Sequence, residues 1–254
     1  MKRFLLITTL GLLSILSVSA QETLKIMSYN IQSGINAPIE EIGQYIASEE
    51  VDLVALQECD WINNRSKKSN PGKEDLINVL AHETRMFPLY GQTIHFAGGF
   101  YGIGLLSRYP IVRSECIELP NPSKDEQRVM LKADVKLPSG KIVTFICTHL
   151  DYKSDDVQLE QVKFINKHTK EKNLTFICGD FNCTPESAPS LKMRERWTDL
   201  TNRDFTFSTK YPEVKIDYIY AKKGHDVDLI STRVVYDTLL SDHFQIVSVV
   251  KIGE

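Results

Sequence analysis

Cysteine is scarce in this chain and follows no pattern that would make it a scaffold. Five cysteines occur in 254 residues, with no CxxC pair and no Cys/His spacing typical of a zinc site. Cys147 and Cys178 lie in apolar runs that predict buried strands, where cysteine behaves as a small hydrophobe. Because the chain is long enough to bury a core unaided, this pattern argues against a disulfide scaffold, a redox motif and a structural zinc site.

Basic residues are not in excess. Lysine plus arginine number 30, against 33 for aspartate plus glutamate, which gives a net charge of −3. This balance disfavours a protein that holds nucleic acid mainly through a cationic surface, but it does not exclude an enzyme that grips one phosphate. The sequence has no internal repeat or low-complexity tract. Its 42% hydrophobic and 25% charged residues exclude disorder, collagen-like repeats and coiled coil.

A long apolar run is confined to the N-terminus. Two basic residues precede an apolar stretch from Phe4 to Val18, which ends at the small-residue cleavage signal Val18-Ser19-Ala20. This layout is typical of a secretory signal peptide, and the stretch is short for a membrane span. We therefore expect residues 1–20 to be a signal peptide, with an uncleaved anchor as the alternative, and the protein to be exported, either periplasmic or secreted. Removal of residues 1–20 takes the net charge of the chain from −3 to −5. No later segment predicts a transmembrane anchor, and we expect a monomer.

The remaining residues, 21–254, alternate short apolar strands with a few helices, which predicts one domain of layered α/β architecture. The polar stretch Asn63–Asp75 is interpreted as a mobile surface loop. The segment Gly91–Gly99 is interpreted as a loop that contributes to specificity. The expected helices are Pro38–Ser48, Glu74–His82 and Ser154–His168. The expected strands are Leu24–Ile31, Asp52–Gln57, Tyr101–Ser107, Ile111–Leu119, Arg128–Leu137, Lys141–Thr148, Leu174–Cys178, Val214–Ala221, Val227–Val235 and Phe244–Ile252.

Acids, amides and histidines interrupt these apolar strands close to their ends. Each of them alone has an ordinary explanation as a solvated or turn residue. Asp217 is harder to explain in that way, because a carboxylate between Ile216 and Tyr218 costs stability unless it is paired or bound. Ligand sites gather where strands end and loops begin, so the set as a whole predicts a functional site. Its members are Asn30, Glu58, His149, Asp180, Asn182, Asp217, Asp242 and His243.

The segments that carry these residues resemble the endonuclease/exonuclease/phosphatase superfamily of metal-dependent phosphoesterases. They occur in the order of that family and span nearly all of the mature chain. The resemblance implies a four-layer α/β/β/α sandwich of two packed mixed sheets, with the site at one end. The matching segments are Ser28-Tyr29-Asn30-Ile31, Leu56-Gln57-Glu58, Tyr101-Gly102-Ile103-Gly104-Leu105-Leu106-Ser107-Arg108, Thr148-His149-Leu150, Gly179-Asp180-Phe181-Asn182, Ile216-Asp217-Tyr218 and Ser241-Asp242-His243.

The resemblance and the residue types together assign a cofactor. A hard cation such as Mg²⁺ takes oxygen ligands from carboxylates and amides. Glu58 is the first candidate for a direct metal ligand, supported by Asn30, and Asp242 is a further candidate, direct or through water. We expect Mg²⁺ as the cofactor, with Mn²⁺ as a possible substitute.

The catalytic roles follow from the resemblance. Asp180 and His243 are the residues that activate water, and the sequence does not settle which of them is the base; we assign His243 as base and Asp180 as the residue that positions the water. Asp217 resembles the family's partner of that histidine, which fixes its tautomer. Asn182 and His149 are expected to donate hydrogen bonds to phosphate oxygens.

Two arginines are candidates for substrate binding, since a guanidinium can grip a phosphate through two hydrogen bonds. Arg65 lies in the polar stretch after Glu58, and Arg128 precedes an expected strand; a solvated surface arginine is the equal alternative for each. The Gly98-Gly99 pair is followed by Phe100 and Tyr101, which pack in the core or wall the site.

The sequence therefore predicts an exported, Mg²⁺-dependent phosphoester hydrolase that prefers phosphodiesters and works by in-line attack of activated water. The substrate classes left open are a lipid headgroup, a small phosphodiester and nucleic acid. One alternative is a secreted endo- or exonuclease, although basic residues cluster only weakly. The other is a non-catalytic binder of phosphate or lipid headgroups on the same scaffold, against which the full set of site residues argues.

Overall fold

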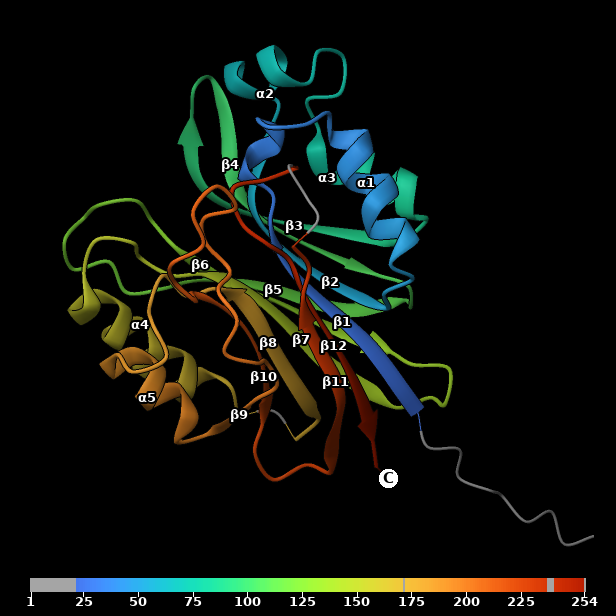
Figure 1. The fold of residues 1–254 in the computed structure, drawn as a ribbon, viewed down its shortest axis with the longest axis vertical. Helices are drawn as coiled ribbons and strands as arrows, with labels where there is room; N and C mark the ends of the chain where they lie inside the picture. Colours follow the sequence, from blue (N-terminus) through green and yellow to red (C-terminus); the bar gives the residue numbers. More distant parts are fainter. Residues whose placement is uncertain (1–21, 171, 237–239, 254) are drawn as a thin grey trace, which may run out of the picture.

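Two six-stranded sheets form the centre of the molecule (Figure 1). The structure is a computed structural model, which describes residues 22–170, 172–236 and 240–253. The expected signal peptide, residues 1–20, lies outside the described residues. The first sheet has the strand order β11 (Val227–Val234), β12 (Ile246–Ile252), β1 (Glu22–Asn30), β2 (Leu53–Trp61), β4 (Gly99–Ser107) and β3 (Phe87–Phe96). The second has the order β5 (Ile111–Glu118), β6 (Val129–Lys136), β7 (Ile142–His149), β8 (Leu174–Asp180), β10 (Asp217–Lys222) and β9 (Trp197–Asp199).

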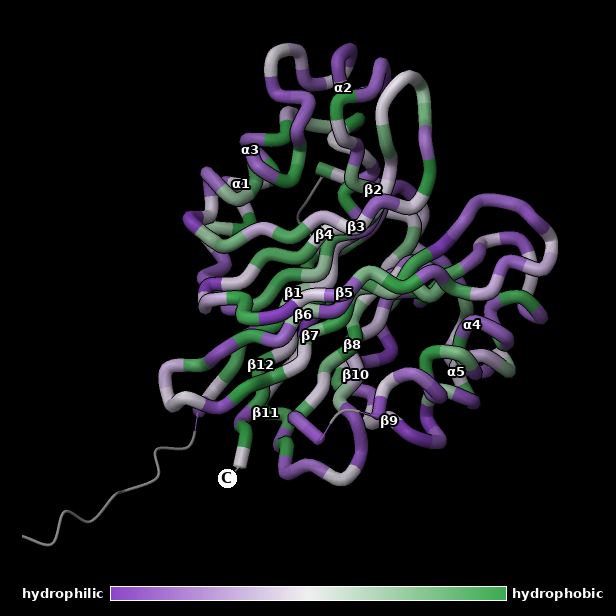
Figure 2. Tube along the Cα trace, turned by 180° about the vertical axis from the view of Figure 1, so that it is seen from behind, coloured by the Kyte–Doolittle hydropathy of each residue, from purple (hydrophilic) through white to green (hydrophobic). Residues whose placement is uncertain are grey.

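Helices cover the outer face of each sheet, so the molecule has four layers. One apolar core lies between the two sheets, a second lies between the first sheet and α1 and α3, and a third lies between the second sheet and α4 and α5. Figure 2 shows hydrophobic residues concentrated along the central strands and hydrophilic residues along the outer loops. The helices are α1 (Ile39–Ser48), α2 (Asn64–Ser69), α3 (Leu76–Thr84), α4 (Asp155–His168) and α5 (Ala188–Arg194), with a 3₁₀ turn, η1, at Gln32–Gly34. The predicted α/β/β/α sandwich of mixed sheets is confirmed.

Amphipathic spacing explains how the helices attach. Ile39, Ile42 and Ile46 of α1 recur three and four residues apart and are fully buried against the first sheet. In α4, the Ser154 side chain accepts a hydrogen bond from the N–H of Val157, and Asp155 lies in the first turn at the positive end of the helix dipole. These are the signals from which both helices were predicted.

The two parallel strand pairs position the polar residues. β1 lies parallel to β2, with Asn30 beside Gln57, and β7 lies parallel to β8, with His149 beside Asp180. Parallel strands end at the same edge of a sheet, and so their carboxyl-terminal residues gather there. Gly179 lets β7 and β8 approach closely, because a Cβ at this position would lie 2.0 Å from the carbonyl oxygen of Thr148.

Two segments interpreted as loops are ordered differently in the structure. Residues 64–69 form α2, whose capping box joins Asn63 and Ser66, both of them buried. The interpretation of Asn63–Asp75 as a mobile surface loop was therefore wrong for this part. Most of Gly91–Gly99 belongs to β3, an edge strand paired antiparallel with β4. The short elements α5 and β9 were not predicted either, and β10 begins at Asp217 rather than Val214.

No helix within the described ranges is long and apolar enough to span a membrane.

We predict that Asn63→Ala destabilises the protein. Its Oδ1 accepts a hydrogen bond from the N–H of Ser66 at 2.8 Å, and its Nδ2 donates to the carbonyl of Phe100 at 2.9 Å. Losing both contacts is expected to lower the free energy of unfolding by about 1–2 kcal/mol, a fall in Tm of about 2–8 °C in thermal denaturation. Asn64→Ala, next to it and exposed, is the matched control; an equal fall for both variants would contradict the prediction.

Candidate active site

A cleft of about 340 Å³ opens at the edge where these strands end. Side chains from both sheets and from the loops between them meet in it. Six of the residues selected from the sequence as catalytic groups or metal ligands line the cleft: Glu58, His149, Asp180, Asn182, Asp242 and His243. The site is therefore a convergence of segments that lie far apart in the sequence.

Asn30, at the end of β1, is the hydrogen-bonding centre of this cluster. Its fully buried Nδ2 lies 3.2 Å from Glu58 Oε1 and 3.2 Å from Asp180 Oδ2, and 3.4 Å from His243 Nε2. Its Oδ1 accepts a hydrogen bond from the N–H of Gln32 at 3.1 Å, which orients the amide. One side chain thus links the carboxylates of the two sheets to the histidine.

His243 lies between two carboxylates. Its Nδ1 lies 3.0 Å from Asp217 Oδ2, and its Nε2 lies 3.6 Å from Asp180 Oδ2. Burial alone would lower the pKa of the His243 imidazole, but the charges of Asp217 and Asp180 outweigh it and raise this pKa. Burial, followed by the charge of Asp217, raises the pKa of Asp180. Because Nδ1 is occupied by Asp217, Nε2 is the ring nitrogen that lies beside Asp180, a residue of the cleft wall.

His149 lies on the other side of Asp180, where β7 ends. Its Nε2 is 3.5 Å from Asp180 Oδ2, and its Nδ1 has no hydrogen-bond partner among the described residues. Burial, and then the charge of Arg128, lowers the pKa of His149 well below its ordinary value. A neutral imidazole with an unused ring nitrogen is therefore held in the wall of the cleft.

Asn182 is positioned by the turn that follows β8. Its backbone N–H donates to Asp180 Oδ1 at 2.9 Å, its Nδ2 donates to the carbonyl of Leu150 at 3.1 Å, and its φ of +51° places it in the left-handed region that asparagine tolerates. Gln158 of α4 donates to the Asn182 carbonyl at 2.9 Å. The predicted contact of Asn182 with phosphate remains a prediction, with one donor of the amide engaged by the backbone.

Glu58 projects from an irregularity in β2. The register of β2 against β4 shifts between Leu56 and Cys59, and Glu58 adopts a φ of +58° there. Such a bulge re-aims a side chain next to a site. Ser33 Oγ holds the Glu58 carbonyl at 3.1 Å. Burial raises the pKa of the Glu58 carboxyl, while the hydrogen bond from Asn30 opposes that shift.

The donor set fits a hard divalent cation. Glu58 and Asp242 face one cleft with Asp180, and among the residues lining it Arg128 alone carries a fixed positive charge. Glu58 and Asp242 offer carboxylate oxygens, which Mg²⁺ prefers, while Asn30 directs its Nδ2 to Glu58 and its Oδ1 to the N–H of Gln32; a direct metal bond from Asn30 remains a prediction. Asp242 Oδ2 accepts a hydrogen bond from Gln32 Nε2 at 2.8 Å. Asp180, Asp217 and His243 also present ligand atoms within 4.8 Å of one another, but His243 Nδ1 and Asp217 are already paired.

The two candidate arginines differ in their surroundings. Arg128 is 2% exposed and lines the cleft. Arg65 is not among the lining residues: its Nε and Nη2 lie 2.8 and 2.7 Å from the two carboxylate oxygens of buried Asp60, and its Nη2 also donates to Ser33 Oγ at 2.8 Å. The rings of Phe96 and Tyr101 lie 4.6 and 5.4 Å from its guanidinium carbon. Arg65 therefore braces the segments behind Glu58, and its contact with substrate remains a prediction.

Sequence reasoning missed several residues of the cleft wall. Tyr152 lies two residues after the Thr148-His149-Leu150 segment, so its closeness to that segment was a usable signal. For Tyr101 the sequence left two positions open, the wall of the site or the core. In the structure Tyr101 is buried and also lines the cleft. Ile216 belongs to the matching segment Ile216-Asp217-Tyr218, although no role in the cleft was predicted for it, and nothing in the local sequence marked Glu126 and Phe207.

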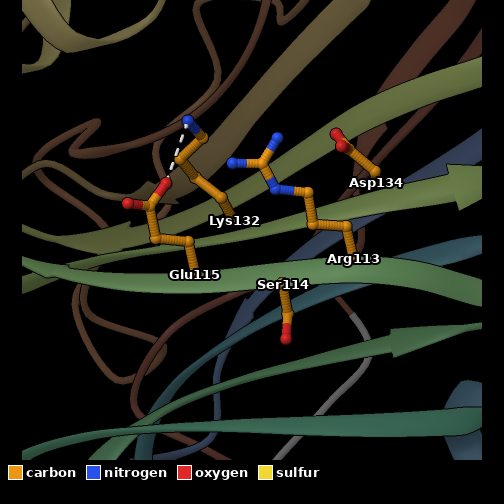
Figure 3. A pocket seen from close by; sticks show the side chains of 5 residues that line it. All are labelled: Arg113, Ser114, Glu115, Lys132 and Asp134. Atoms are coloured by element: carbon orange, nitrogen blue, oxygen red, sulfur yellow. Dashed lines mark ion pairs between the residues drawn. The ribbon is translucent and has the colours of Figure 1, made fainter.

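Another depression lies on the outer face of β5 and β6, away from these residues (Figure 3). Its charged side chains are largely engaged with one another and with neighbours: Lys132 Nζ lies 3.6 Å from Glu115 Oε2, and Asp134 Oδ1 accepts a hydrogen bond from Thr144 at 2.7 Å. It brings together none of the residues selected from the sequence.

Comparison with known proteins identifies the family. The profile of the Endonuclease/Exonuclease/phosphatase family matches residues 27–243. The chain belongs to this family. This confirms the resemblance, and members of the family are generally hydrolases that act on phosphate esters and typically depend on a divalent metal.

Individual relatives are distant. The Escherichia coli protein YbhP is 22% identical over 220 residues, which cover 80% of this chain and 87% of YbhP. The inositol phosphosphingolipids phospholipase C of Schizosaccharomyces pombe is 22% identical over 200 residues, covering 68% of this chain and 44% of that protein. The structure of a mannosyl-6-phosphatase from Bacteroides thetaiotaomicron superposes with a TM-score of 0.72 at 16% identity, covering 91% of this chain and 100% of that one. The structural likeness shows the shared fold.

We predict that Arg65 and Asp60 stabilise the protein as a pair. Arg65→Met leaves the buried Asp60 carboxylate without its cation and is expected to lower the free energy of unfolding by about 2–4 kcal/mol. Adding Asp60→Asn removes that uncompensated charge and is expected to restore part of the loss. Urea denaturation of the wild type, both single variants and the double variant measures the coupling, and additive effects would contradict it.

Proposed function

We propose that this protein is a Mg²⁺-dependent phosphoester hydrolase, in which an activated water attacks phosphorus in line with the leaving oxygen. The observation that carries the proposal is the connected cluster of Glu58, Asn30, Asp180, His243 and Asp217 at the mouth of one cleft. Burying several ionisable groups side by side lowers the stability of the folded protein unless each is paired. Such clusters are typical of functional sites.

The chain's own residues divide the work. Glu58 would hold a divalent cation, with Asp242 as a further ligand, direct or through water, and Asn30 orienting Glu58 through its Nδ2; the cation would supply positive charge that polarises a phosphoryl oxygen. Asp217 accepts a hydrogen bond from the Nδ1–H of His243 and so fixes the tautomer in which Nε2 is free to take a proton from water. Asp180, 3.6 Å from that nitrogen, orients the water.

The remaining groups suit an anionic, tetrahedral ligand. His149 and the Arg128 guanidinium lie in the same wall of the cleft. Hydrogen bonds from these residues and from Asn182 to non-bridging phosphate oxygens would offset the charge that develops in the transition state. In this assignment Arg128 grips the phosphate, as predicted from the sequence.

The preference for phosphodiesters is part of the proposal. Arg128 is the one fixed cation among the described lining residues, and Glu126 offsets it. With so little positive charge on the protein side, the cleft suits the single negative charge of a diester better than the two negative charges of a monoester. Among relatives, the phospholipase C acts on a diester and the mannosyl-6-phosphatase on a monoester, as their names state.

We also propose that the protein is exported, which rests on the N-terminal segment alone. The nuclease alternative has weaker support, because a cleft lined by four carboxylates, Glu58, Glu126, Asp180 and Asp242, disfavours the neighbouring phosphates of a polynucleotide. Hydrolysis of duplex DNA in preference to small diesters would favour that alternative.

We predict that Glu58→Gln, Asp180→Asn and His243→Ala each abolish Mg²⁺-dependent hydrolysis of bis(p-nitrophenyl) phosphate and leave the fold intact. Each removes a group on which metal binding or water activation depends. Chelation is expected to silence the wild type, and Mg²⁺ or Mn²⁺ to restore it. Exposed Glu118→Gln on β5 is the control. Near-normal turnover in any folded variant removes that residue from the mechanism.

We further predict that Asp217→Asn lowers kcat about 10²–10⁴-fold with a much smaller change in KM. The amide carries no negative charge and can itself donate a hydrogen bond to Nδ1, so neither the His243 tautomer with a proton on Nδ1 nor its imidazolium form is stabilised as in the wild type. Steady-state kinetics test this, with Asp228→Asn on the exposed face of β11 as the matched control. A wild-type kcat would show that Asp217 does not orient the base.

A further inference from the structure

Glu126 is an acid in the cleft wall that the proposed mechanism does not use. It lies in the loop between β5 and β6, two residues before Arg128. Its Oε1 is 3.0 Å from Arg128 Nη1, an ion pair whose side chains are 27% and 3% exposed. The contact is not in hydrogen-bonding geometry. Glu126 Oε1, Arg128 Nε and Arg128 Nη1 are all buried and without hydrogen-bond partners among the described residues.

The segment that carries the Glu126–Arg128 ion pair makes hydrogen bonds with its neighbours. Gln127, between the two residues, donates from Nε2 to the carbonyls of Leu119 and Arg128 at 2.8 and 2.7 Å. Asp125 on the same loop accepts a hydrogen bond at 2.8 Å from Lys153, which lies in the loop after β7. Asp125 and Lys153 therefore connect the loop that carries Glu126 with the loop that carries Tyr152.

An aromatic side chain completes the same wall. Tyr152 is 57% exposed, lines the cleft, and has its ring centroid 5.9 Å from the Arg128 guanidinium carbon. Lys153 Nζ lies 5.5 Å from the same ring centroid, and the exposed part of the ring adds apolar surface to the wall that holds Glu126 and Arg128. Apolar surface of this kind suits the carbon skeleton of a small ligand, while the paired charges suit its polar groups.

The chemistry of the pair restricts its ligand. Arg128 offers donors and Glu126 offers acceptors, so one phosphate satisfies the guanidinium and is repelled by the carboxylate. A hydroxyl group both donates and accepts, and two neighbouring hydroxyls, or a hydroxyl beside the phosphate, can satisfy both side chains together. A purely apolar group would leave the hydrogen-bonding atoms of both side chains without partners, which is costly.

We propose that Glu126, with Arg128 and Tyr152, forms a specificity subsite for the alcohol part of the substrate. It selects phosphoesters of small polyhydroxylated alcohols, whether sugar, cyclitol or glycerol. The proposal rests on the proposed function, because it concerns the same cleft, but it assigns a residue outside the water-activating cluster. Glu126 accepts a hydrogen bond from a hydroxyl that lies close to the phosphate held by Arg128.

The test uses two diesters with the same leaving group, glyceryl p-nitrophenyl phosphate and propyl p-nitrophenyl phosphate, which differ only in hydroxyls. We expect the wild type to hydrolyse the glyceryl diester with at least a tenfold higher kcat/KM than the propyl diester. Only the glyceryl diester has a hydroxyl that can form a hydrogen bond with the charged Glu126 side chain. Glu126→Gln is expected to reduce this ratio about tenfold, because the carboxylate acceptor is lost. Glu118→Gln is the matched control and keeps the wild-type ratio.

A second set of substrates shows which kind of alcohol supplies the hydroxyls. Sugar 6-phosphates and inositol phosphates, compared with glycerophosphodiesters, identify the alcohol that the subsite prefers. Circular dichroism and the Tm of Glu126→Gln and Glu126→Ala establish that the variants are folded, and if one does not fold the other supplies the ratio.

The outcomes separate the two proposals. If neither diester is hydrolysed by the wild type with Mg²⁺ or Mn²⁺, the proposed function fails. If both diesters are hydrolysed at equal rates, or if Glu126→Gln and Glu126→Ala keep the wild-type ratio, the subsite is overturned and the proposed function stands. Faster hydrolysis of oligonucleotides than of glyceryl diesters overturns the subsite as well.

Discussion

The compensation of buried negative charge at one end of the two sheets is the constraint on which this structure depends. Asp180 and Asp217 are almost completely removed from water, and Glu58 is largely buried beside them. Carboxylates in such surroundings require donors, because burial disfavours their charged form. The Asn30 amide and the His243 ring supply those donors, and together they connect both sheets. The site is therefore also the place where the two halves of the sandwich are joined by polar contacts.

Rigid strands and bracing side chains hold this cluster, while loops supply the rest of the cleft. Behind Glu58, the buried Arg65–Asp60 pair and Ser33 secure the irregular end of β2. Opposite it, the joined loops carry Glu126 and Tyr152. Enzymes commonly carry their reactive groups on strands and their recognition groups on loops. A rigid scaffold holds the reactive groups in place and tolerates sequence variation in the loops that it connects.

The errors in the sequence interpretation have physical causes. Residues 64–69 read as a loop because they are polar, yet the capping box from Asn63 to Ser66 and the pairing of Arg65 with Asp60 fold them into a helix. β3 escaped prediction because it is a partly exposed edge strand with a proline and a glycine, Pro88 and Gly91, so it lacks a clear alternating pattern. In both cases tertiary contacts outweighed local preference.

The layered α/β class, most of the strands, the amphipathic helices and the set of polar residues at strand ends were predictable from the amino-acid order, because they depend on local periodicity and on residue types. Which polar residues meet became apparent from the folded chain, since a contact such as Asn30 with Asp180 joins positions 150 residues apart. The folded chain also showed that Arg65 faces Asp60 and that Glu126 faces the cleft. The direction of a side chain at a strand end or in a loop depends on the packing of neighbouring segments, which local sequence does not encode.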